Sequence, residues 1–120
     1  MIRQFHHVLL AMPAGGEADA EAFYAGLLEI PRVVKPEHLE ARGGCWFEDG
    51  EVRIHLGIEA DFRPARKAHP ALIVDDLAAL KLTLEEAGVA VAVDQPLPGF
   101  DRFYASDPFG NRLEFLQPQR

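Results

Sequence analysis

The spacing of apolar and polar positions alternates along the chain between that of a strand and that of a helix. Residues 2–12 read as a strand, and residues 17–28 carry apolar side chains at helical spacing until Pro31 ends them. Three strands follow, at 32–34, 45–48 and 51–58, with a helical turn at 36–42 after the first. The pattern then starts again. A strand at 68–74, a helix that Asp75-Asp76 caps and Gly88 ends, and strands at 89–93, 100–106 and 112–116 complete the chain.

The order strand, helix, three strands therefore occurs twice, which indicates an internal repeat. Arg53-Ile54-His55-Leu56 matches Arg112-Leu113-Glu114-Phe115, and His7 in the first strand matches His69 in the strand that opens the second half. Both matches imply nearly the same offset between the halves. The pattern predicts an α+β fold of two βαβββ modules, roughly residues 1–60 and 66–120, which form one domain over residues 1–120.

Glu114 is the unusual residue of the last strand, because it lies within the apolar run Leu113-Glu114-Phe115-Leu116. A buried carboxylate is costly unless it is paired with a charge or bound to a metal ion. The repeat aligns His55 with Glu114 and His7 with His69, so that each half offers two polar residues inside apolar strands. The joint pattern is more informative than any of these residues alone, since a lone strand histidine is usually a hydrogen-bonded core residue.

Composition narrows the functional classes. The formal net charge of −7 argues against a nucleic-acid partner, and no apolar run approaches the length that crosses a membrane. The N-terminus lacks the features of a signal peptide, and the single cysteine, Cys45, forms no intramolecular disulfide, so we expect a cytoplasmic protein. Cys45 reads as a small buried residue rather than a nucleophile, because nothing adjacent in sequence would lower the pKa of its thiol.

Three segments resemble the vicinal oxygen chelate superfamily, which includes glyoxalase I, bleomycin-resistance proteins, extradiol dioxygenases and fosfomycin-resistance enzymes. They are Phe5-His6-His7-Val8, His69-Pro70-Ala71-Leu72-Ile73-Val74-Asp75-Asp76-Leu77, and the run from Phe103 to Phe115 that contains Asp107-Pro108-Phe109-Gly110-Asn111-Arg112. The resemblance implies paired βαβββ modules whose mixed sheets curl into a cleft around one divalent metal ion. It implies that His7, His69 and Glu114 are the metal ligands, and that a homodimer completes the cleft, so that His7 serves one site while His69 and Glu114 serve another.

The fourth ligand position departs from the glyoxalase I pattern, because His55 stands where that enzyme tends to carry a glutamate. Three roles are open to His55: a fourth ligand, a general base beside the metal ion, or a residue that supports a ligand. Two imidazoles and one carboxylate suit Fe, Mn, Ni, Co or Zn, and the sequence does not choose among them. Trp46, Arg66 and Tyr104 are candidate substrate-binding residues, against the simpler interpretations of core aromatics and a solvated loop cation.

These features predict a small metal-dependent enzyme that acts on an oxygen-bearing small molecule through bidentate chelation. Lyase, isomerase, dioxygenase and thiol-transferase chemistry all fit this description, and the sequence names no substrate. The alternative is a metal-independent protein that binds or sequesters a small molecule, as the bleomycin-resistance members do. A third, weaker interpretation is a structural or regulatory dimer with an empty cleft.

Overall fold

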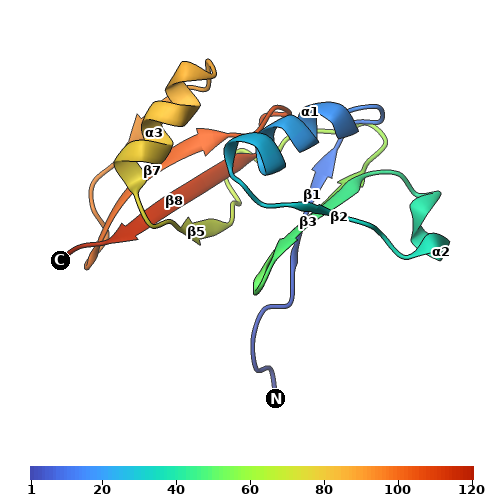
Figure 1. Cartoon of the computed structure of the whole chain (residues 1–120), viewed down its shortest axis with the longest axis horizontal. Coiled ribbons are helices and arrows are strands. Elements are labelled where there is room, and N and C mark those ends of the chain that lie inside the picture. Colours follow the sequence, from blue (N-terminus) through green and yellow to red (C-terminus); the bar gives the residue numbers. More distant parts are fainter. The chain divides into compact units, whose positions relative to one another are not determined.

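The computed structural model describes all residues from Met1 to Arg120 and divides into two compact units, Met1–Pro64 and Ala65–Arg120. Both consist of a four-stranded mixed sheet with helical segments. The ribbon in Figure 1 shows these strands and helices. The predicted α+β class and the duplicated order of elements are confirmed.

The first unit contains β1 (Val8–Met12), α1 (Glu17–Glu21), the π-helical segment η1 (Ala22–Leu27), β2 (Arg32–Val33), α2 (Glu37–Glu40), β3 (Cys45–Asp49) and β4 (Val52–Ile58). Its sheet has the order β1-β4-β3-β2, in which β1 and β4 run parallel and the other pairs antiparallel. Tyr24 of η1 stacks on Phe47 of β3 with ring centroids 5.3 Å apart. The helical segments thus cover the sheet face that buries Met12, Phe47, Ile54 and Leu56.

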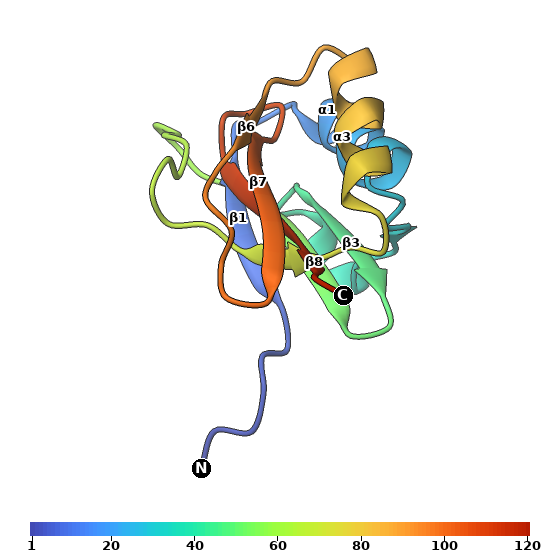
Figure 2. The same cartoon turned by 90° about the vertical axis from the view of Figure 1, so that its left-hand side faces the viewer.

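The second unit contains β5 (Ala71–Ile73), α3 (Leu77–Glu86), β6 (Val91–Val93), β7 (Phe100–Ser106) and β8 (Arg112–Pro118). Its sheet order, β5-β8-β7-β6, reproduces that of the first unit. Asp76 caps α3 as predicted, because its Oδ1 accepts a hydrogen bond from the Ala79 amide at 3.0 Å. Figure 2 shows α3 along one side of the unit, beside β7 and β8. Phe103, Leu113 and Phe115 are buried on these two strands.

Strand registers confirm the repeat alignment. Leu9 of β1 lies opposite His55 of β4, and Ala71 of β5 lies opposite Glu114 of β8. His7 and His69 each stand two residues before those partners. His55 and Glu114 therefore occupy equivalent places in the two sheets, as do His7 and His69.

Three predicted strands extend clearly beyond those of the structure, and the one predicted at 89–93 begins only at Val91. The prediction of a strand from residue 2 is wrong for residues 2–7, because β1 begins at Val8, where it meets Ile54. Before Val8, a side chain replaces the backbone pairing, because Nη1 of Arg53 donates a hydrogen bond to the His6 carbonyl. The strand predicted at 68–74 is reduced to β5, since Pro70 lacks an amide donor. The Pro70 carbonyl still accepts from the Glu114 amide at 3.1 Å.

The turn before β8 is built as its residues predict. The Asp107 carboxylate accepts hydrogen bonds from the Phe109 and Asn111 amides, both at 2.9 Å. Gly110 adopts a φ of 92°, which a residue with a side chain rarely accepts. This turn returns the chain antiparallel to β7 and fixes which side chains of β8 share a face.

Candidate functional site

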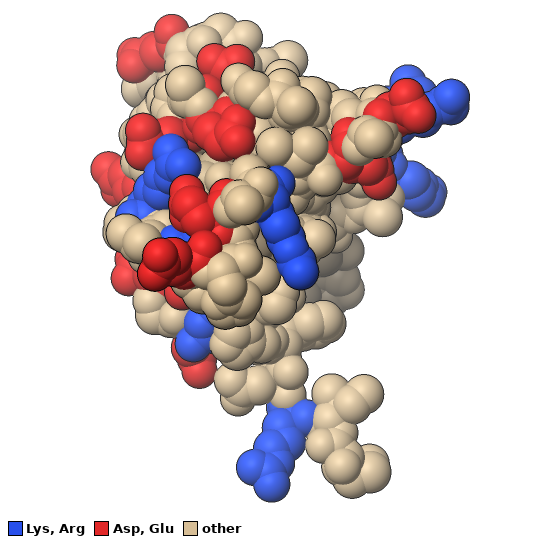
Figure 3. Space-filling model, turned by 90° about the vertical axis from the view of Figure 1, so that its right-hand side faces the viewer, with Lys and Arg blue, Asp and Glu red and all other residues tan.

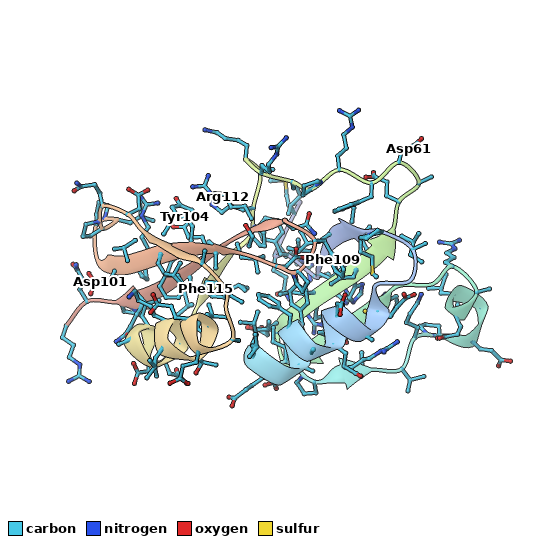
Figure 4. The ribbon with its side chains drawn as sticks, turned by 90° about the horizontal axis from the view of Figure 1, so that it is seen from above. Asp61, Asp101, Tyr104, Phe109, Arg112 and Phe115 are labelled. Carbon is cyan, nitrogen blue, oxygen red and sulfur yellow. The ribbon has the colours of Figure 1, made fainter.

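One face of the second sheet carries the polar side chains. Alternation along β7 and β8 places Arg102, Tyr104, Arg112 and Glu114 on the same side, opposite Phe115. Figure 4 shows Tyr104 and Arg112 on the side of the ribbon away from α3, and Phe115 between the sheet and α3. The apolar residues therefore form the core, while the polar face is left for another purpose.

Glu114 is only 5% exposed, and both of its carboxylate oxygens are engaged. Oε1 lies 2.9 Å from Nε2 of His69. Oε2 accepts a hydrogen bond from Nη1 of Arg102 at 3.2 Å. The sequence predicted that a buried glutamate in this strand needs a partner, and the structure supplies two.

The hydrogen bond at Nδ1 of His69 determines what Nε2 of the same ring can offer to Glu114. Nδ1 lies 2.8 Å from the Lys67 carbonyl oxygen, which can only accept, so Nδ1 carries a proton. A neutral His69 ring then presents the lone pair of Nε2 to a carboxylate oxygen at 2.9 Å. Two acceptors repel at that distance. The contact requires a shared proton, on His69 or on Glu114, or a cation that both atoms bind.

Arg102 is fully committed on this face. Beyond its contact with Glu114, Nη1 donates to the Tyr104 hydroxyl at 2.8 Å and Nε donates to the Gln95 carbonyl at 2.8 Å. Nη2 lies 3.5 Å from the Asp94 carboxylate. These contacts hold Arg102 in place, so that it orients Glu114 rather than reaching outward.

The first unit has a corresponding cluster, which we call the histidine stack: His7, His55 and Trp46. The His55 ring lies between the other two, 4.0 Å from the Trp46 ring and 4.3 Å from the His7 ring by centroid. Its Nε2 is 2.7 Å from Oε2 of Glu48. Burial lowers the pKa of His55, and the hydrogen bond to Glu48 opposes that shift without reversing it.

The structure brings some predicted site residues together. His69, Glu114 and Tyr104 lie on one face, with the His69 and Tyr104 rings edge-to-face at 5.3 Å. His7, His55 and Trp46 form the histidine stack of the other unit. Arg66 is exposed on the segment before His69. No group of three or more His, Cys, Asp or Glu side chains is arranged to hold a metal ion, so the complete ligand set stays a prediction.

Sequence reasoning missed Glu48, Arg102 and Arg112 as parts of these clusters. The signal for Arg112 was present, because strand alternation puts it on the face of Glu114. Arg102 could be found only with the β7–β8 register, in which it pairs with Leu116, diagonal to Glu114. Glu48 required the β3–β4 register, which sets Trp46 opposite His55 and Glu48 opposite Arg53.

A cavity of about 610 Å³ lies elsewhere on the first unit, between α1, β2, α2, β3 and the loop from β2 to α2, and its lining includes Arg32, Lys35 and Cys45. It contains none of the predicted site residues. Three glutamates line it beside the two cations, so it carries no clear charge preference. The surface drawn in Figure 3 likewise intersperses acidic and basic side chains, without the continuous basic area that nucleic acid requires.

Cys45 is expected to react slowly with thiol reagents in the native protein. It is 1% exposed, and burial raises the pKa of its thiol, so that the reactive thiolate is both scarce and covered. Labelling with dithionitrobenzoate at pH 7.5 should be at least ~100-fold slower than in guanidinium chloride, where local opening no longer limits access. Cys45→Ala supplies the blank, and rapid stoichiometric labelling of the folded chain would contradict the expected burial.

No helix combines the length and apolar character needed to span a membrane. None of the curated proteins compared matches the chain. Among solved structures, a glyoxalase family protein from Bacillus anthracis is 44% identical, with 99% of this chain and 98% of that chain covered and a TM-score of 0.94.

Two more distant structures share the fold. The fosfomycin resistance protein FosX from Listeria monocytogenes is 13% identical, with 99% of this chain and 96% of that chain covered and a TM-score of 0.77. The antibiotic binding protein TnmS3 from Streptomyces sp. CB03234 is 22% identical, with coverage of 99% and 100% and a TM-score of 0.74.

The family comparison agrees with these structures. A family model described as the Glyoxalase/Bleomycin resistance protein/Dioxygenase superfamily matches residues 4–115, which confirms the resemblance seen in sequence. Superfamily membership supports either metal-dependent chemistry or small-molecule binding, and divalent metal ions are typical of its members. The chain belongs to the Glyoxalase/Bleomycin resistance protein/Dioxygenase superfamily.

Proposed function

We propose that this protein is a metal-dependent enzyme that acts on an oxygen-bearing small molecule, and that His69 and Glu114 bind the divalent ion. The observation that carries the proposal is the contact between Nε2 of His69 and Oε1 of Glu114. The proton on Nδ1 is committed to the Lys67 carbonyl, so a neutral ring presents the lone pair of Nε2 to the carboxylate, whereas a doubly protonated ring forms an ion pair with it. A bound cation accepts both lone pairs at once.

The geometry of the pair suits such an ion. Nitrogen and oxygen ligands lie about 2.1 Å from a divalent transition metal, so two neighbouring ligands are about 3.0 Å apart in octahedral sites and about 3.4 Å apart in tetrahedral zinc sites. The observed separation is 2.9 Å. Arg102 holds Oε2 of Glu114 and leaves Oε1 directed at His69. Little side-chain movement is therefore needed for the pair to bind Fe, Mn, Ni, Co or Zn.

His7 is proposed as the third ligand because it occupies the place in the first unit that His69 occupies in the second. The protein is further proposed to be a homodimer in which His7 and the His69–Glu114 pair of one metal site come from different copies of the chain. Support comes from the sheet edges: β1 and β5 each pair with one neighbour only, and their residues Leu9 and Ile73 are 62% and 67% exposed. We also propose that the protein is cytoplasmic.

When bound, the ion would act as a Lewis acid and template for substrate oxygens. The chain's own residues have separate tasks. Arg102 orients the Glu114 carboxylate, and Tyr104 packs its ring against His69. His55 is proposed to move a proton: its Nε2–H donates to Glu48, as in a base that a carboxylate orients, which leaves Nδ1 as the accepting atom.

His69→Ala tests the ligand role directly. We expect isothermal titration with Zn²⁺ or Ni²⁺ to show an affinity at least ~100-fold lower than that of the native chain, because one of the proposed ligands is lost. His38→Ala is the matched control, since His38 lies exposed on α2 and should leave the titration unchanged. Equal affinities in the native chain and His69→Ala would remove His69 from the site.

The second candidate function is metal-independent binding of a small molecule. Trp46 favours it, because its half-buried ring forms the outer layer of the histidine stack and offers a flat aromatic surface. The related fold of TnmS3, an antibiotic binding protein, is consistent with such a role. Here His69→Ala would leave affinity for the ligand nearly intact, whereas Trp46→Ala would weaken it. The enzyme hypothesis expects His69→Ala to abolish turnover.

A further inference from the structure

Arg112 is the uncommitted cation on the polar face of the second sheet. Its guanidinium carbon lies 3.8 Å from the centroid of the Tyr104 ring. Unlike Arg102, it forms no ion pair with any carboxylate of the chain. Stacking on an aromatic face orients a guanidinium while leaving the N–H groups along its edge available. Arg112 is therefore a positioned donor without an anionic partner.

Tyr104 links Arg112 to the proposed metal site. The Tyr104 ring meets Arg112 with its face and lies edge-to-face with His69, at 5.3 Å. Arg112 and Glu114 are also alternate residues of one strand, about 6.6 Å apart along it and on the same face. A small molecule whose oxygens reach the His69–Glu114 pair could thus present a second group to Arg112. Figure 4 shows Arg112 and Tyr104 together on this side of the sheet.

A backbone hydrogen bond brings a segment with two more cationic residues next to Arg112. The Arg112 amide donates to the Ala65 carbonyl at 2.8 Å, which ties the start of β8 to the segment containing Arg66 and Lys67. The carboxylates of this region, Glu114 and Asp94, both pair with Arg102, and Glu114 also contacts His69. A chain with a net charge of −7 repels anions in general, so a local cationic group is needed to retain one.

We propose that Arg112 binds an anionic group of the substrate, which makes the substrate a carboxylate, phosphate or phosphonate that also carries vicinal oxygens. This inference rests on the proposed function and specifies its substrate class. A guanidinium presents two parallel N–H donors to such an anion, and charge-assisted bonds of this type are roughly twice as strong as neutral ones. The anion and the chelating oxygens would then be held at two points of one face.

The test compares two metal-chelating probes on Zn²⁺-loaded protein by isothermal titration. Succinic monohydroxamic acid carries a chelating hydroxamate and a carboxylate, while its primary amide replaces the carboxylate with a neutral group. The native chain should prefer the acid by about 10-fold or more. Arg112→Gln should abolish this preference while its affinity for the amide stays unchanged. Arg63→Gln, at an exposed loop position, should retain the preference. Retention of the preference in Arg112→Gln would overturn the proposal.

Failure of the metal site gives a different result. If the chain takes up no metal ion, neither hydroxamate binds through chelation, and the proposed function is wrong. The role of Arg112 is then tested by titrating the metal-free chain with inorganic phosphate. The titration is monitored through the Nε–H resonances of the arginine side chains in nitrogen-15 NMR spectra. Saturable shifts that disappear in Arg112→Gln support an anion site. Shifts that persist in Arg112→Gln, or no shifts in the native chain, contradict it.

Discussion

Glu114→Gln is expected to destabilise the metal-free protein by about 2–3 kcal/mol and to remove any stabilisation by added metal. Glutamine keeps the size of Glu114 but leaves the half-buried Arg102 guanidinium with only the 3.5 Å contact to the Asp94 carboxylate, and removing one partner of a largely covered ion pair is costly. The neutral amide is also a poor metal ligand. Urea unfolding with and without Zn²⁺ measures both effects.

Glu85→Gln is the matched control for this substitution. Glu85 lies on α3 and pairs with Lys81 at 3.2 Å, but both side chains are largely exposed, so solvent screens the pair. We expect a change within ~0.5 kcal/mol and an unaltered response to metal. If Glu114→Gln loses stability but added metal stabilises neither the native chain nor this variant, Glu114 is a purely structural partner of Arg102.

Gly44→Ala should be the most damaging single substitution outside the site. Gly44 adopts a φ of 79°, and a Cβ at this position would overlap the backbone carbonyl of Leu56. Backbone atoms of β4 cannot move aside without breaking the pairing of Cys45 with Leu56. We expect a loss of more than ~3 kcal/mol, since left-handed strain and steric overlap add together. Thermal unfolding by circular dichroism, or failure to express folded protein, reports it.

Gly50→Ala separates the two causes of that loss. Gly50 also has a positive φ, of 59°, but an added Cβ would meet no atom within 4 Å. The cost should therefore be the conformational strain alone, about 1 kcal/mol. Similar stabilities of Gly44→Ala and Gly50→Ala would show that the close approach to Leu56 does not limit the fold.

The elements of the fold follow from local patterns, and the partners within the site do not. Alternating strands, the Asp76 cap and the Asp107 turn depend on neighbours in sequence, so the sequence predicts them. The same alternation identified Glu114 as a carboxylate in need of a partner. Residues 2–7 were misassigned because a strand exists only where another strand pairs with it, and pairing is a property of the sheet.

Side-chain partners depend on register. Arg102 reaches Glu114 from a neighbouring strand, and Glu48 reaches His55 in the same way. Neither contact is visible until β7 is aligned with β8 and β3 with β4. The internal repeat identifies equivalent positions without any knowledge of strand register. Aligning the two halves matches His7 with His69 and His55 with Glu114.

Elemental mass analysis of the untagged native chain tests the central claim most directly, with Glu114→Ala measured beside it. After incubation with Mn, Fe, Ni, Co or Zn and removal of excess, the native chain should retain about one metal ion per chain, and the variant should retain none. Equal metal content in both chains, or none in either after every incubation, would contradict a metal site at His69 and Glu114.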